Sequence, residues 1–98
     1  HCYMPVAECQ RWVELNAGLA REWTESGKVW VTEWAMTDCY IPGGTAAAVA
    51  AAETFTRWLA DHPAVERQAW FIAQMPGQRC ATALLDATGA PTAFGAWY

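Results

Sequence analysis

The run KVWVTEWAM, residues 28–36, is mostly apolar but carries one carboxylate, Glu33, near its end. An ionised side chain in apolar surroundings is costly unless a nearby group makes use of its charge. His1 and Tyr3 lie two positions apart, and so on one face of an extended segment, while Trp70 stands near the end of another apolar run. A carboxylate can attack or stabilise an oxocarbenium ion, a phenol can orient that carboxylate, and an indole can stack on a sugar ring. These residue types point to sugar chemistry, with a solvated strand-end glutamate as the open structural alternative for Glu33, while a tryptophan such as Trp70 is more often a core residue than a stacking surface.

A helix is predicted before Glu33, and a strand is predicted to contain it. From Pro5 onward, apolar residues recur at steps of three and four, which predicts an amphipathic helix over roughly residues 5–25. Ser26 and Gly27 supply its stop signal. The following run, VWVTEWA, is rich in β-branched and aromatic residues and is too short for a helix of its own. It predicts a parallel strand over residues 28–35 with both faces covered.

The second half of the chain repeats this order of elements. An alanine-rich helix is expected over about residues 46–61, with Thr45 as its N-cap and Pro63 close after its end. AVERQAWFIA, residues 64–73, predicts a second strand, and a loop follows over residues 74–79. Alternating strands and helices imply parallel strands joined by crossover helices, and hence an α/β fold.

The ends of the chain add two incomplete elements. Residues 1–3 fit the end of a third strand, and after a turn at residues 86–89 a last helix is expected to start near Thr92. Two strands and a strand end leave both sheet edges open and one face of each helix poorly buried, so such a unit is marginally stable alone. We therefore expect residues 1–98 to be one sector of a larger barrel or sheet, and the start at His1 rather than Met to mark a fragment or a processed form.

Glu33 stands at the end of its strand, where α/β barrels carry functional residues. In α/β barrels, active sites lie at the C-terminal ends of the parallel strands, where this chain has Glu33 and the candidate substrate-binding residue Trp34. Alternation along the strand predicts two faces, one with Val29, Val31 and Glu33 and the other with Trp30, Thr32 and Trp34. Glu33 would then lie above an inward-facing column of valines at the barrel mouth.

Composition excludes several other classes of protein. With 54% hydrophobic and 16% charged residues, the chain is too apolar to be disordered. A net charge of −4 and six scattered basic residues argue against a nucleic-acid partner. The longest alanine-rich stretch is too short to span a membrane, and no signal segment opens the chain. Four cysteines without a C-x-x-C pair give no metal site, so no metal or cofactor is expected, and disulfides and buried free thiols both remain open.

Four stretches taken together resemble a known family. H-x-Y at a strand end, KVWVTEWA, HPAVERQAWFIAQ and ALLDATGAPTAFGAWY are similar, in order and spacing, to the C-terminal part of a clan-A (β/α)8 glycoside hydrolase. The most similar type is the glycosyl hydrolase catalytic core family, which includes endo-β-1,3-glucanases of family 128. The resemblance covers nearly the whole chain. It departs from the family pattern at Lys28-Val29, at Trp34 in place of Phe and at Gln68 in place of Tyr.

The resemblance implies a partial TIM barrel, from the end of strand six through strand eight. It implies that Glu33 is the nucleophile of a retaining β-glucan hydrolase, with a β-1,3-linked glucan as the expected substrate. His1 and Tyr3 would line the same site from the sixth strand, and Trp70 would lie beside the reactive sugar. The family carries its acid/base residue on the fourth strand, outside this chain, and the only local substitute is Asp38. The isolated 98-residue chain is therefore expected to be inactive on laminarin or related β-glucans without the missing N-terminal barrel strands.

Two further expectations concern the cysteines and the setting of the protein. Cys39 and Cys80 fall in the loops after adjacent strands, so both would lie on the catalytic face and could form a disulfide. An extracellular or cell-wall location follows from the substrate class and the even number of cysteines. The alternatives are a tryptophan-rich carbohydrate-binding module and a structural α/β module, both without catalysis.

Overall fold

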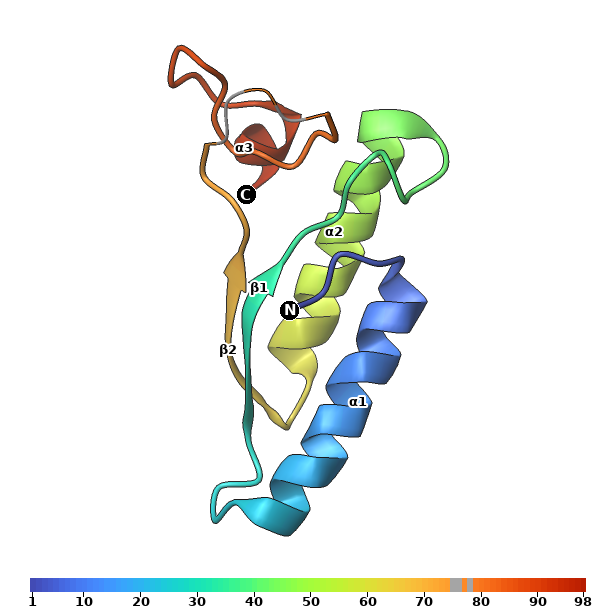
Figure 1. The fold of residues 1–98 in the computed structure, drawn as a ribbon, viewed down its shortest axis with the longest axis vertical. Helices are drawn as coiled ribbons and strands as arrows, with labels where there is room; N and C mark the ends of the chain where they lie inside the picture. Colours follow the sequence, from blue (N-terminus) through green and yellow to red (C-terminus); the bar gives the residue numbers. More distant parts are fainter. Residues whose placement is uncertain (75–76, 78) are drawn as a thin grey trace.

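The computed structural model describes residues 1–74, 77 and 79–98 as alternating helices and strands. In chain order these are α1 (Val6–Trp23), β1 (Val29–Trp34), α2 (Gly44–Asp61), β2 (Val65–Trp70) and α3 (Ala93–Trp97) (Figure 1). β1 and β2 pair in parallel, and α2 forms the crossover between them. The predicted α/β class and the parallel strands are confirmed. Two paired strands are compatible with a sector of a TIM barrel but do not by themselves establish one.

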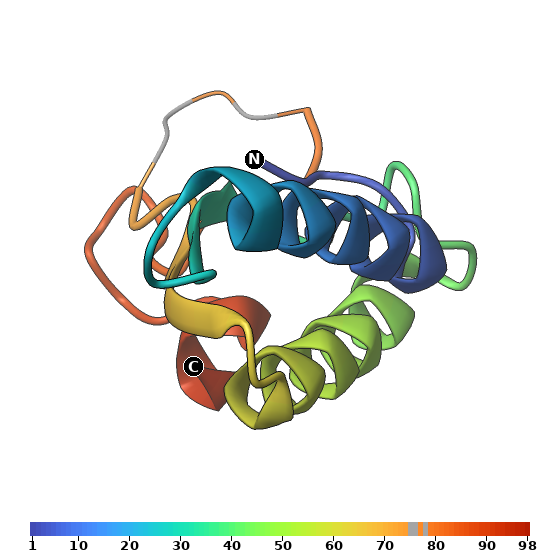
Figure 2. The same ribbon diagram turned by 90° about the horizontal axis from the view of Figure 1, so that it is seen from below.

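The two long helices lie beside the sheet and beside each other. α1 packs on β1 and α2, while α2 also packs on β2 and α3. Figure 2 shows α1 and α2 running beside each other, and Figure 1 shows α3 past the C-terminal end of β2, toward the start of α2. Across the described ranges, no helix combines the length and apolar character needed to cross a membrane.

α1 buries only part of its apolar surface. Its buried residues are Cys9, Val13, Ala17 and Ala20, spaced by four, four and three positions along one helix face. A second apolar face remains exposed, at 53% for Trp12, 55% for Leu15, 49% for Leu19 and 80% for Trp23. These four residues share the apolar spacing that predicted the helix, but β1 and α2 together cover only part of the helix circumference.

α2 begins one residue before the predicted cap. Gly43 is the N-cap, with a positive φ of 106° that favours glycine, and the helix starts at Gly44. Thr45 is therefore inside the first turn, and its hydroxyl donates to Asp38 Oδ2 at 3.3 Å. The prediction of Thr45 as the N-cap was wrong. The predicted end is confirmed, because the helix stops at Asp61 before Pro63.

Aromatic side chains tie the layers together. Trp34 is fully buried and meets Phe55 of α2 edge-to-face at a centroid distance of 5.1 Å. It also meets Trp70 of β2 at 4.8 Å, and Trp70 in turn lies 5.3 Å from the buried Phe94 of α3. Edge-to-face pairs of this kind add to the stabilisation from buried area. One aromatic network thus connects both strands with α2 and α3.

The C-terminal segment follows its sequence signals. Gly89 N donates to Asp86 O at 3.1 Å, which forms the predicted turn. Thr92 is the N-cap of α3 and accepts a hydrogen bond from Gly95 N at 3.2 Å, so the predicted start of this helix is also confirmed. Gly95 packs against the backbone of Leu84 so closely that a Cβ atom would lie 1.9 Å from the Leu84 carbonyl oxygen.

Candidate active site

His1, Tyr3 and Glu33 come together at the C-terminal end of β1. Tyr3 Oη donates to Glu33 Oε2 at 2.6 Å, and His1 Nδ1 lies 3.0 Å from the same oxygen. Because an ionised carboxylate only accepts hydrogen bonds, His1 must carry a proton on Nδ1 to make this contact. The structure therefore joins three of the five residues that the sequence singled out for chemistry and binding.

The backbone around Cys2 explains why these residues meet. Cys2 forms an isolated parallel bridge with Trp34, in which Cys2 N donates to Glu33 O at 2.9 Å and Ala35 N donates to Cys2 O at 3.1 Å. Side chains alternate along an extended segment, so a buried Cys2 directs its two neighbours to the opposite side. His1 and Tyr3 consequently lie on the side where Glu33 is only partly buried.

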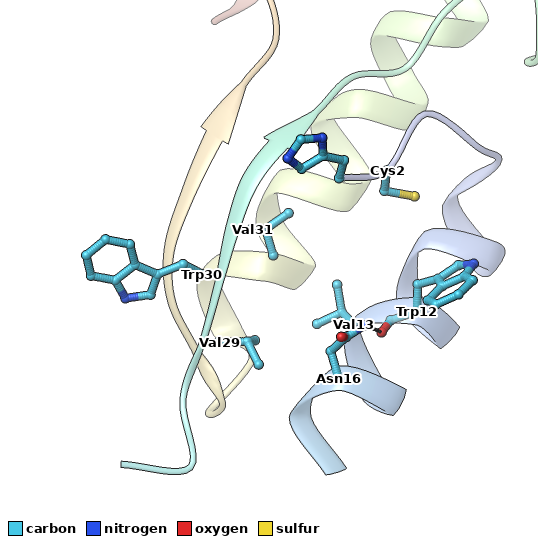
Figure 3. Close-up of a pocket in the computed structure, with 8 residues that line it drawn as sticks. Cys2, Trp12, Val13, Asn16, Val29, Trp30 and Val31 are labelled. Atoms are coloured by element: carbon cyan, nitrogen blue, oxygen red, sulfur yellow. Dashed lines mark hydrogen bonds between the residues drawn. The ribbon is translucent and has the colours of Figure 1, made fainter. Parts of the chain in front are cut away.

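The predicted division of β1 into two faces holds only for its first half. Figure 3 shows Val29 and Val31 directed toward α1 and Trp30 directed away from it. Trp30 is 63% exposed, whereas Trp34, predicted on the same face, is fully buried. The β1–β2 pairing is irregular between Val31 and Trp34, and such an irregularity breaks strict alternation. The predicted inward-facing column of valines is wrong, because Val29 and Val31 face α1.

A cavity of about 430 Å³ lies between α1 and β1, and His1 forms part of its rim. Its lining includes Val13 and Trp12 of α1 together with Val29 and Val31 of β1 (Figure 3). The carboxylate of Glu33 is outside this lining. The cavity is therefore a space with a mixed polar and apolar lining beside the cluster, and it does not contain the Glu33 carboxylate.

Burial and the neighbouring Glu33 carboxylate keep the Tyr3 hydroxyl protonated. Burial of the phenol, its hydrogen bond to Glu33 and the negative charge of that carboxylate all raise the pKa of Tyr3 well above its ordinary value. Tyr3 therefore remains a proton donor throughout the neutral range. The Glu33 side chain is 35% exposed, so an ionised carboxylate held by Tyr3 is also open to a ligand.

The two predicted tryptophans lie elsewhere. Trp34 is on the buried side of β1, and its indole N–H donates to Gln68 Oε1 at 2.6 Å, so it is a core residue with no surface for a ligand in this structure. Trp70 is partly buried, and its indole N–H donates to Thr82 O at 2.9 Å. Neither indole contacts His1, Tyr3 or Glu33 through a hydrogen bond. Phe71, which sequence reasoning missed, packs its ring edge-on against Tyr3 at 5.9 Å.

Asp38 and the loops after the strands form a braced unit. Asp38 Oδ1 accepts from Ala81 N at 3.0 Å, and its Oδ2 accepts from Thr45. The structure joins Cys39 to Cys80, the pair that the sequence suggested, with their Cα atoms 5.5 Å apart. Asp38 is thus occupied with holding loops together, which is a structural task rather than that of a second acid.

A second disulfide, between Cys2 and Cys9, was not predicted. The even number of cysteines was the only signal for it, because the pairing depends on how residues 1–3 meet α1. Within the ranges described, no group of three or more His, Cys, Asp or Glu side chains is arranged to hold a metal ion.

The fold and the cluster define a class of protein. An α/β unit with a carboxylate at the end of a parallel strand, held by a phenol and an imidazole, is compatible with a site for carbohydrate chemistry. The sequence model of the glycosyl hydrolase catalytic core family matches residues 1–98, and the chain belongs to this family. The resemblance seen in the sequence is thereby confirmed, and the family implies a carbohydrate as substrate. Neither a curated protein nor a solved structure matches the chain.

Proposed function

We propose that Glu33 is the nucleophile of a retaining glycoside hydrolase that acts on a β-glucan, with β-1,3 linkages as the expected target. The observation that carries this proposal is the paired contact of Tyr3 and His1 with one carboxylate oxygen at the end of β1. Both donors come from the segment of residues 1–3 and hold the carboxylate at the strand end, where its side chain is 35% exposed. Membership of the glycosyl hydrolase catalytic core family supports the same chemistry.

The two carboxylate oxygens have different surroundings. Both contacts are made to Glu33 Oε2, and among the described residues none donates a hydrogen bond to Oε1. Oε1 is therefore the oxygen available to attack an anomeric carbon. Tyr3 and His1 fix the plane of the carboxylate and stabilise its charge until the bond to the sugar forms. Water then hydrolyses the glycosyl-enzyme ester and returns Glu33 to its ionised state.

A retaining enzyme also needs an acid that protonates the leaving oxygen, with its carboxyl group about 5–5.5 Å from the nucleophile. Asp38 is engaged by the Ala81 amide and the Thr45 hydroxyl, so it is a poor candidate. We propose that the acid comes from a part of the protein outside residues 1–98. Trp70 remains the candidate stacking surface for the sugar, because its ring is only partly buried.

The test uses Glu33→Gln in the protein that contains this chain, with a β-1,3-glucan as substrate. We expect kcat to fall by several orders of magnitude with the fold intact, because an amide cannot form the glycosyl ester. Glu66→Gln is the matched control, since Glu66 lies on the neighbouring strand and accepts from Trp30 Nε1 at 2.6 Å. A 2-deoxy-2-fluoro glycoside should label the peptide that carries Glu33. Near-normal activity of Glu33→Gln, or a label on another carboxylate, would refute the nucleophile role.

A carbohydrate-binding role without catalysis is the second candidate. It is favoured by the exposed indoles of Trp12 and Trp30, since exposed aromatic rings can stack on sugars. Glucan binding that is equal in the parent and in Glu33→Gln, with no hydrolysis by either, would support it. We also propose that the protein is extracellular or associated with a cell wall. Its two disulfides, Cys2–Cys9 and Cys39–Cys80, support an oxidising compartment.

A further inference from the structure

The residue between the two donors of Glu33 is a disulfide cysteine. Cys2 is joined to Cys9 in the first half of α1, and the two Cα atoms are 5.7 Å apart. Both cysteines are buried in the hydrophobic core, with exposed fractions of 4% for Cys2 and 0% for Cys9. The disulfide thus attaches the segment of residues 1–3, through its central residue Cys2, to the long helix α1.

The disulfide lies on the side of the segment of residues 1–3 that faces away from Glu33. Cys2 points toward α1, while His1 and Tyr3 on either side of it reach Glu33 Oε2. On the β1 side the segment is held by a single bridge, in which Cys2 N donates to Glu33 O and Ala35 N to Cys2 O. Two backbone hydrogen bonds at Cys2 fix its pairing with β1 but leave the segment of residues 1–3 free to rotate about that point. The covalent bond to α1 supplies the second point of attachment.

We propose that the Cys2–Cys9 disulfide is a positioning element of the site: it holds Tyr3 and His1 in contact with Glu33, beyond its contribution to the fold. The consequence for catalysis rests on the function proposed above. The geometric part does not, because the contact between Tyr3 and Glu33 can be measured without a substrate.

The chain offers its own control for stability. The Cys39–Cys80 disulfide closes a sequence separation of 41 residues, against 7 for Cys2–Cys9, and it does not involve residues 1–3. In the loop-entropy account, removing the bond with the longer loop destabilises the fold more. If stability alone governed the site, Cys39→Ala/Cys80→Ala would disturb Glu33 more than Cys2→Ala/Cys9→Ala. A positioning role predicts the reverse.

The first measurement is the pKa of the Tyr3 hydroxyl. NMR monitors the chemical shift of the ring carbon that bears the hydroxyl as the pH is raised, and the spectrum of Tyr3→Phe identifies the signal of Tyr3. In the parent and in Cys39→Ala/Cys80→Ala we expect Tyr3 to ionise well above the ordinary pKa of a tyrosine. In Cys2→Ala/Cys9→Ala the pKa of Tyr3 should fall back toward that ordinary value. If Tyr3 keeps its raised pKa in that variant, or loses it equally in the control, the proposal is wrong.

The second measurement is a mutant cycle on activity in the protein that contains this chain. We expect Tyr3→Phe and Cys2→Ala/Cys9→Ala each to lower kcat about tenfold with little change in KM, and their combination to lower it no further. Independent, multiplied losses would contradict the proposal. If hydrolysis proves independent of Glu33, the proposed function fails while the Tyr3 measurement still decides the geometric part.

Cys2→Ala/Cys9→Ala leaves a gap in the buried packing around both residues, which is itself destabilising. Cys2→Val/Cys9→Ala refills part of the apolar volume and serves as the second test of the same bond. If neither this variant nor Cys2→Ala/Cys9→Ala folds under conditions in which Cys39→Ala/Cys80→Ala does, the disulfide is required by the whole fold, and a role specific to the site is refuted.

Discussion

Gly95→Ala gives the most direct test of how α3 is seated against the rest of the chain. A Cβ atom at this position would lie 1.9 Å from Leu84 O and 2.8 Å from Leu84 C. Ordinary van der Waals contact begins near 3.4 Å, so the two backbones must separate by about 1.5 Å. Gly95 has no positive φ, so the expected effect comes from this steric overlap and not from backbone strain.

The magnitude follows from what that separation breaks. Thr92 N donates to Leu84 O at 2.8 Å, and a shift of this size removes that hydrogen bond, worth about 1 kcal/mol. Overpacking adds about 1–3 kcal/mol. We therefore expect Gly95→Ala to lower the free energy of unfolding by about 2–4 kcal/mol, or the Tm by at least roughly 10 °C.

The assay is thermal unfolding followed by near-UV circular dichroism, which reports the packing of Trp70 against Phe94. Gly18→Ala is the matched control, because Gly18 lies inside α1 and its nearest neighbour to an added Cβ is Arg21 Nη2 at 4.0 Å. There alanine should stabilise by about 0.5–1 kcal/mol through its helix propensity. A Gly95→Ala protein that melts with the parent, or above it, would show that α3 does not pack on Leu84 as described.

Two further predictions concern pH. The pKa of Tyr3 is raised in the folded state, so its contribution to stability is present below its ordinary pKa and is lost as pH rises above about 10. Urea titrations at about pH 9 and pH 11 should therefore show a smaller loss of stability in Tyr3→Phe than in the parent. Hydrogen bonds from the Thr88 hydroxyl and from the Thr88 and Ala90 amides lower the pKa of Asp86, so its contribution is lost as pH falls below about 4. Asp86→Asn should flatten this acid limb, and an unchanged limb would show that the turn does not depend on the charge.

The sequence predicted the order and type of the elements because their signals are local. The helical spacing after Pro5, the β-branched run before Glu33 and the cap at Thr92 each depend on neighbours a few residues away. The meeting of His1, Tyr3 and Glu33 could be predicted for a similar reason. Each follows from its place at the end of a strand, once the strands are taken as parallel.

What the sequence could not predict depends on long-range packing. Trp34 was predicted to share a face with Trp30 and to bind substrate, but the pairing in β1 is irregular and Trp34 packs in the core against Phe55. The exposure of Trp12, Leu15, Leu19 and Trp23 could not be predicted, because apolar spacing does not reveal how much of a helix its neighbours cover. The Cys2–Cys9 pair could not be chosen from parity alone, since four cysteines allow three connectivities.

The contacts that define the site span long stretches of chain. Tyr3 reaches Glu33 across 30 residues, and Cys39 reaches Cys80 across 41. The helices, in contrast, are held by bonds between residues four apart. Partial denaturation can therefore separate His1 and Tyr3 from Glu33 while the far-UV circular dichroism signal of the helices persists. Helix content is then a poor measure of an intact site, and a functional assay needs a local probe such as the Tyr3 ring.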